Sequence, residues 1–181
     1  MTDTGFTSLL EAPGTMDADF EATVSFTSPA DAVFDALTTP SGLTGWWMKA
    51  SGSGLAGGEL TFVNDDNSVV VRVDTAERPS VVRWTVLAAF GPFEDWLGMT
   101  ISFDVSPDEG GGARLHFRHT GLTPQLECFD TCSAGWNHYL PRLVAYVDSG
   151  RGNPVASDGE RIHIVFRLVS RPPTRVGREK G

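Results

Sequence analysis

Six short segments of this chain carry the residue patterns of β-strands, and one long segment after them carries the pattern of an amphipathic helix. The first strand segment, residues 20–27, alternates apolar and polar side chains, as a strand does when only one of its faces is buried. The other five, each bounded by turn residues, are 59–63, 68–74, 80–87, 98–105 and 113–120. This order predicts an α+β fold in which a sheet of about six antiparallel strands packs one face against a helix.

Two short helices are predicted between the first and second strand segments. Ser28 is expected to cap the first helix, Pro29 suits its first position, and Pro40 ends it. The second is indicated by the apolar residues Leu43, Trp46 and Trp47. The glycine-rich stretch 51–58 that follows lacks the GK[ST] ending of a phosphate-binding loop, so we expect a loop or bend there.

Residues 121–150 predict one long C-terminal helix. Thr123 is the expected cap, Pro124 the first helical residue and Gly150 the stop. One stripe repeats at steps of three and four: Leu126, Phe129, Ser133, Trp136, Leu140, Leu143 and Val147. Because Pro141 has no backbone N–H, we also expect a kink near residues 137–140.

Length and charge suggest one domain with two different flanks. We expect the domain over residues 20–154, an acidic segment over 1–19, and a basic tail over 155–181 with a possible extra strand at 161–169. Residues 1–150 hold 20 acidic and 7 basic residues, a net charge of −13, whereas residues 151–181 hold 3 and 7, a net charge of +4. An acidic body repels phosphates, so nucleic acid is not an expected partner.

The sequence suggests a cytoplasmic location. It contains no run of about 18 apolar residues that would span a membrane, and its first residues lack the pattern of a secretory signal. Two cysteines are too few for a disulfide framework, which favours a reducing compartment.

The order of elements is that of a helix-grip fold, in which a curved sheet wraps a final helix. Four stretches carry a closer resemblance: 28–47, 96–105, 115–122 and 127–154. Through them the chain resembles the START-like (SRPBCC) superfamily, and is similar to the activator of heat-shock-protein-90 ATPase. The resemblance covers residues 20–154 and implies a cavity between helix and sheet. Members of the superfamily hold lipids, hormones or polyketides, and some are cyclases, so the fold does not fix the function.

No metal or cofactor is expected. His116 and His119 are three apart on a strand and face opposite sides, and Cys128 and Cys132 lack two further ligands nearby. His119 shares the apolar face of its strand, where a core histidine bonded to a neighbour is favoured over one that contacts a ligand. No nucleophile and base are spaced as a catalytic pair, so no catalytic residue is assigned.

Aromatic side chains are the strongest functional signal, because ligand pockets are concave and mostly apolar with a few polar groups. In a helix-grip fold several of them must line the space between helix and sheet. The candidate ligand-binding residues are Trp46, Trp47, Trp84, Phe90, Trp96, Phe103, Phe117, His119, Phe129, Ser133, Trp136 and Tyr139. The sequence leaves open whether this space is empty or filled by these same side chains.

Three functions follow as expectations. The first is a protein, monomeric or homodimeric, that binds a small apolar or aromatic molecule and is not an enzyme. The second is a cyclase or hydrolase in which His119 or Tyr139 transfers a proton with help from Glu94 or Asp95. The third, a chaperone-associated module, is implied by the resemblance alone.

Overall fold

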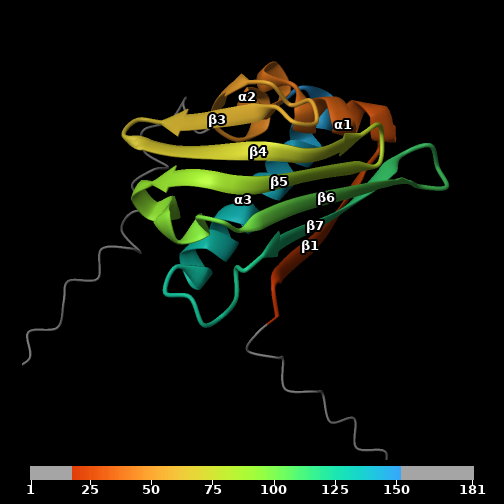
Figure 1. The fold of residues 1–181 in the computed structure, drawn as a ribbon. Coiled ribbons are helices and arrows are strands. Elements are labelled where there is room, and N and C mark those ends of the chain that lie inside the picture. The colour runs from red at the N-terminus through yellow and green to blue at the C-terminus, as the bar shows by residue number, and fades with distance from the viewer. Residues whose placement is uncertain (1–17, 152–181) are drawn as a thin grey trace, which may run out of the picture.

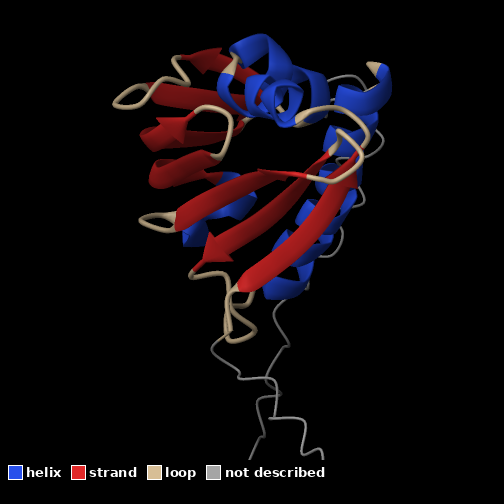
Figure 2. Ribbon diagram, turned by 90° about the vertical axis from the view of Figure 1, so that its right-hand side faces the viewer, coloured by secondary structure: helices blue, strands red, loops and turns tan. Residues whose placement is uncertain are grey.

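A computed structural model describes residues 18–151 of the chain (Figure 1). One antiparallel sheet has the strand order β1-β7-β6-β5-β4-β3-β2, and the helix α3 lies along one face of it (Figures 1 and 2). The arrangement is the predicted α+β helix-grip fold, with seven strands. Residues 1–17 and 152–181, which include most of the acidic segment and the possible strand 161–169, lie outside the described residues.

The elements follow the predicted order closely. Their bounds are β1 Phe20–Phe26, α1 Ala30–Thr38, α2 Pro40–Trp46, β2 Lys49–Gly52, β3 Glu59–Asn64, β4 Asn67–Glu77, β5 Val81–Phe90, the 3₁₀ helix η1 Gly91–Trp96, β6 Thr100–Pro107, β7 Ala113–Thr120 and α3 Phe129–Ser149. All six predicted strands and both short helices are confirmed. The first two residues of the stretch predicted as a loop, 51–58, belong instead to β2, because this segment pairs with β3.

The start of α1 differs from the prediction. Pro29, not Ser28, is the N-cap residue, and no side chain caps this helix. Ser28 has other partners: its backbone N–H donates to the Asp148 carboxylate at 3.0 Å, and its hydroxyl donates to the Val147 carbonyl at 3.3 Å. The residue therefore joins the first helix to the end of α3.

The start of α3 also differs. The helix begins at Phe129 and not after Thr123, because tight turns fill the intervening residues. The N–H of Leu126 bonds to the Thr123 carbonyl at 3.0 Å, and the N–H of Phe129 bonds to the Leu126 carbonyl at 3.1 Å. The helix continues through Pro141 and ends as predicted, at Gly150 in the left-handed conformation. The kink remains a prediction.

Burial separates the two faces of the sheet. In β7 the side chains of Ala113, Leu115, Phe117 and His119 are buried, and the four that alternate with them are exposed. The exposed face carries ion pairs, among them Arg118 with Glu21 of β1. The buried face meets α3 (Figure 2), so the core lies between helix and sheet.

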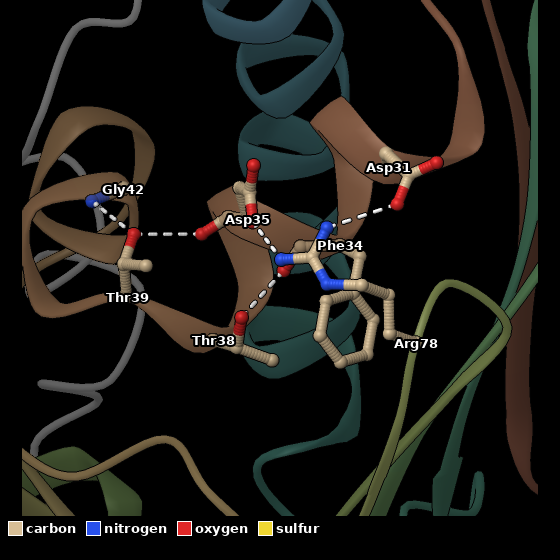
Figure 3. A network of polar contacts seen from close by, with 7 residues as sticks. All are labelled: Asp31, Phe34, Asp35, Thr38, Thr39, Gly42 and Arg78. Atoms are coloured by element: carbon tan, nitrogen blue, oxygen red, sulfur yellow. Dashed lines mark hydrogen bonds and ion pairs between the residues drawn. The ribbon is translucent and has the colours of Figure 1, made fainter.

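An ion-pair cluster fastens α1 to the turn between β4 and β5 (Figure 3). The Arg78 guanidinium donates to the carboxylates of Asp31 and Asp35, and its central carbon lies 4.8 Å from the centroid of the Phe34 ring. All these charged side chains are largely exposed, so we assign the cluster a role in placing the helix and none in the core.

Candidate ligand-binding site

Strand register places a row of side chains across the centre of the buried face. Trp84 of β5 is opposite Ile101 of β6, which in turn is opposite His119 of β7. Because directly paired residues point to the same side of a sheet, all three face α3. A second row brings together Phe103 and Phe117, whose ring centroids are 5.3 Å apart.

The helices add further aromatic rings to these rows. Trp136 of α3 lies 4.6 Å from Phe117 and 5.1 Å from Trp47, measured between ring centroids. Trp47 directly follows α2 and also contacts Trp46 and Trp84. From η1, Trp96 stacks on Trp136 at 5.6 Å. The aromatic cluster, as we use the term, consists of Trp46, Trp47, Phe62, Trp84, Trp96, Phe103, Phe117, His119 and Trp136.

The rings of this cluster fill the space between α3 and the sheet. Exposed fractions are 0% for Trp84, Phe103, Phe117 and His119, and at most 3% for the remaining members. A void of ligand size beside these rings would leave part of their surface accessible, so they pack against one another and their neighbours. In this structure the space between α3 and the sheet is therefore filled by side chains and is not an open cavity.

His119 is the polar centre of the aromatic cluster. The indole N–H of Trp136 donates to Nδ1 of His119 at 3.0 Å, so in the neutral ring the proton is on Nε2. Burial lowers the pKa of His119 to about 3, because the charged imidazolium would lose its hydration. The imidazole is therefore neutral at physiological pH. The expected core histidine bonded to a neighbour is what the structure contains.

Two buried N–H groups in the described part of the chain have no hydrogen-bond partner: Nε1 of Trp84 and Nε2 of His119. Most buried polar groups in native proteins are paired, and those left unpaired call for a specific explanation. By contrast, the indole N–H of Trp46 donates to the Ala36 carbonyl at 3.0 Å, and that of Trp96 donates to Sγ of Cys132 at 3.2 Å.

The structure brings eight of the twelve candidate residues into the aromatic cluster. The other four are Phe90, Phe129, Ser133 and Tyr139. Phe90 is 57% exposed at the end of β5. Phe129 and Tyr139 are partly buried and pack against the core. The hydroxyl of Ser133 donates to the Phe129 carbonyl within α3, so the backbone of the helix already occupies it.

Phe62 is a cluster member that the sequence argument missed. Its ring centroid lies 4.5 Å from that of Trp47 and 5.5 Å from that of Trp84, and its exposed fraction is 0%. The signal was present, because Phe62 is two residues from Leu60 in a strand segment and therefore shares its buried face.

The acidic pair and the two cysteines lie at one end of the aromatic cluster. Glu94 and Asp95 are exposed on η1, and neither is a hydrogen-bond partner of His119, whose Nδ1 accepts from Trp136 and whose Nε2 has no partner. Burial, followed by the neighbouring Cys132 and Asp95, raises the pKa of the Cys128 thiol. The thiol is thus protonated at neutral pH and is a poor nucleophile.

Two further findings concern only residues 18–151. No three His, Cys, Asp or Glu side chains in this range come together as a metal site would require. None of its helices has the length and hydropathy needed to cross a lipid bilayer.

Comparison with protein families finds a match. The model of the family described as "Activator of Hsp90 ATPase homolog 1-like protein" matches residues 27–148, more than half of the chain. The ends of this match are in direct contact, since the backbone N–H of Thr27 donates to the Asp148 carboxylate at 3.0 Å. The search of curated proteins finds no match.

Several solved structures share the fold. The Aha1 dimer from Colwellia psychrerythraea is 23% identical, with a TM-score of 0.67, over 75% of this chain and 99% of the other. Protein SSP2350 from Staphylococcus saprophyticus is 17% identical, with a TM-score of 0.61, over 76% and 98% of the two chains. CalU16 from Micromonospora echinospora is 19% identical, with a TM-score of 0.57, over 82% and 81%. Identities this low establish a common fold alone.

Proposed function

The chain belongs to the family of Activator of Hsp90 ATPase homolog 1-like proteins, and we propose that it binds a small apolar or aromatic molecule between α3 and the sheet. The observation that carries this proposal is the aromatic cluster. Its rings touch one another from α2 across the sheet to η1, and they concentrate apolar surface where a helix-grip protein would hold a ligand.

Because the cluster is closed, a ligand enters only when side chains move. We place the entrance at η1. Trp96 is held there by a hydrogen bond to the Cys132 sulfur, which is a weak acceptor. Phe90 and Leu97, which flank η1, are 57% and 63% exposed, so two apolar side chains lie at the surface beside the exposed Glu94 and Asp95. Movement of η1 would uncover Trp136 and His119, which Trp96 contacts directly.

Two measurements test the proposal. Native mass spectrometry of the purified protein should detect a retained small molecule. NMR titration with naphthalene should shift the signals of Trp96, Trp136 and His119. Trp96→Ala should bind naphthalene more rapidly because the entrance is wider. Phe90→Ala, which removes an exposed ring outside the cluster, should leave the rate unchanged. No retained molecule together with no naphthalene-induced shifts in the cluster would refute the proposal.

The geometry gives no support to the cyclase or hydrolase alternative with His119 as the proton-transfer group. That form of the mechanism needs a carboxylate beside His119, whereas Nδ1 of the ring accepts from Trp136 and Nε2 has no partner. Glu94 and Asp95 are exposed. A neutral imidazole with a pKa of about 3 is also a weak base.

The family description favours a second candidate, a chaperone-associated module. Affinity capture with purified heat-shock protein 90 is the direct test. Stoichiometric binding that does not depend on Trp136 or Trp96 would favour this function over ligand binding. If heat-shock protein 90 does not capture the protein, the chaperone-associated function is ruled out.

Location and oligomeric state are part of the proposal. A cytoplasmic protein is supported by the two cysteines, both of which are free thiols. A monomer or a homodimer is proposed, and the solved Aha1 from Colwellia psychrerythraea is itself a dimer. Light scattering of the full chain distinguishes the two states.

A further inference from the structure

We propose that the ligand is a neutral, planar aromatic molecule with a carbonyl oxygen, and that Trp84 Nε1–H and His119 Nε2–H donate hydrogen bonds to that oxygen. The inference rests on the proposed function and names the chemical class that the same site takes. Its basis is a pair of unpaired donors on one row of the sheet.

The two donors lie on the same face and at the same level of the sheet. Trp84 and His119 are on β5 and β7, separated only by Ile101 of β6. Neighbouring strands are about 4.8 Å apart, so the Cα atoms of the two residues are roughly 10 Å apart. The side chain between them is apolar and provides no acceptor to either group.

Both unpaired groups are donors, not acceptors. An indole N–H can only donate a hydrogen bond, so the unpaired group of Trp84 is a donor. For His119, the hydrogen bond that Nδ1 accepts from Trp136 leaves the ring proton on Nε2. The missing partner must therefore supply lone pairs. A ligand without an acceptor, such as a plain hydrocarbon, would leave both groups unsatisfied.

A buried water fits the site poorly. A water molecule typically makes about three hydrogen bonds in a protein interior. Here it would accept from one or both donors, but it would also need acceptors for its own two hydrogens. The one acceptor nitrogen of the cluster, Nδ1 of His119, is already used by Trp136. Trp96, which packs against His119, offers no acceptor, and its N–H already donates to Cys132.

The ligand should also be uncharged. Among the described residues no Lys or Arg side chain is buried, and His119 is neutral, so a buried carboxylate would have no counter-charge. An ammonium group would bring more donors to a site that already lacks acceptors. A ketone or quinone oxygen on a flat ring system satisfies the donors without a charge. The ring system itself can stack with indoles such as Trp47 and Trp136.

A matched pair of probes tests the inference. 9-Fluorenone and fluorene have the same three-ring shape and differ in one carbonyl group. Calorimetric titration of the full chain should give at least tenfold tighter binding for fluorenone. Trp84→Phe keeps an aromatic ring but removes one of the two N–H donors, so it should reduce this preference and affect fluorene little. Trp46→Phe is the control, because its N–H already donates to Ala36; it should change both affinities by the same factor.

Infrared spectroscopy gives a second measurement that needs no variant. The carbonyl stretch of fluorenone bound to the parent protein should lie below its frequency in cyclohexane, as hydrogen bonding requires. Equal binding of fluorene and fluorenone, or an unshifted carbonyl stretch, would overturn the inference while leaving an apolar binding protein in place. Failure of both probes to bind would overturn the inference and, together with an absence of retained molecules, the proposed function.

Discussion

Trp136 of α3 and His119 of β7 share a hydrogen bond of 3.0 Å in which the indole N–H donates to the imidazole Nδ1. The bond connects the C-terminal helix to the sheet at a point where both side chains are almost fully buried. It fixes the tautomer of the imidazole and the orientation of the indole together. The packing of α3 on the sheet and the proposed ligand recognition therefore share His119.

Replacement of Trp136 by alanine should lower the free energy of unfolding by about 3–5 kcal/mol, because a large buried ring is removed from a filled space. Urea denaturation followed by circular dichroism measures the change. Phe90→Ala, at an exposed ring, should change it by less than about 0.5 kcal/mol. A loss below about 1 kcal/mol for Trp136→Ala would mean that the space readily collapses or is open.

The low pKa of His119 predicts a pH dependence of stability. In the unfolded chain the imidazole titrates near 6.5, whereas in the folded protein burial lowers its pKa to about 3. Below pH 6.5 the unfolded state binds the additional proton, so stability falls as the pH falls. For this group alone, the loss between pH 7.5 and pH 5 is about 2 kcal/mol.

The matched comparison for that pH dependence is His119→Gln. The variant lacks the titrating group, so its free energy of unfolding should change less over the same pH range. The other three histidines remain in both proteins and cancel in the comparison. Identical pH profiles for parent and variant would show that His119 is not buried in the neutral form.

Two glycines should respond to alanine in opposite directions. At Gly54 an added Cβ would lie 1.8 Å from the backbone carbonyl oxygen of Thr38, so Gly54→Ala should destabilise the protein by about 1–3 kcal/mol or more. At Gly135 nothing lies within 4 Å, and the residue is inside α3. Gly135→Ala should therefore stabilise by about 0.5–1 kcal/mol. Thermal unfolding of both variants provides the measurement.

The Cys128 thiol should react slowly with iodoacetamide in the folded protein. Burial, Cys132 and Asp95 all raise its pKa, and only the thiolate reacts rapidly. Mass spectrometry at pH 8 should show at least tenfold faster alkylation in urea. Asp95→Asn removes a neighbouring negative charge and should accelerate the native reaction, whereas Glu94→Gln should not. Rapid alkylation of the folded parent would contradict the assigned environment.

Much of the fold was predictable because it depends on local periodicity. The alternation in 113–120 determines which side of β7 faces the core, and Gly150 ends α3 as expected. Helix starts were less predictable. Ser28 has the chemistry of a cap, but Asp148, 120 residues away, binds its backbone instead. Contacts over such a sequence distance leave no trace in a local pattern.

The site was predictable as a set of residue types and not as a set of contacts. Alternation placed His119 on the buried face, and helical spacing placed Trp136 opposite it. Their hydrogen bond depends on the distance between helix and sheet, which no local rule gives. Phe90 was misplaced because the pairing of β5 with β4 shifts register between Val86 and Ala88, so Ala89 pairs with the buried Val69 and Phe90 lies on the other face, 57% exposed.

The aromatic cluster also determines the intrinsic tryptophan fluorescence of the protein. The chain has five tryptophans, and all of them, Trp46, Trp47, Trp84, Trp96 and Trp136, are members of the cluster. Indoles at these separations exchange excitation energy, so their emission behaves as one signal and not as five. Tryptophan fluorescence excited at 295 nm therefore comes from the aromatic cluster. The parent protein contains its own fluorescent reporter of the region between α3 and the sheet, with no background from elsewhere in the chain.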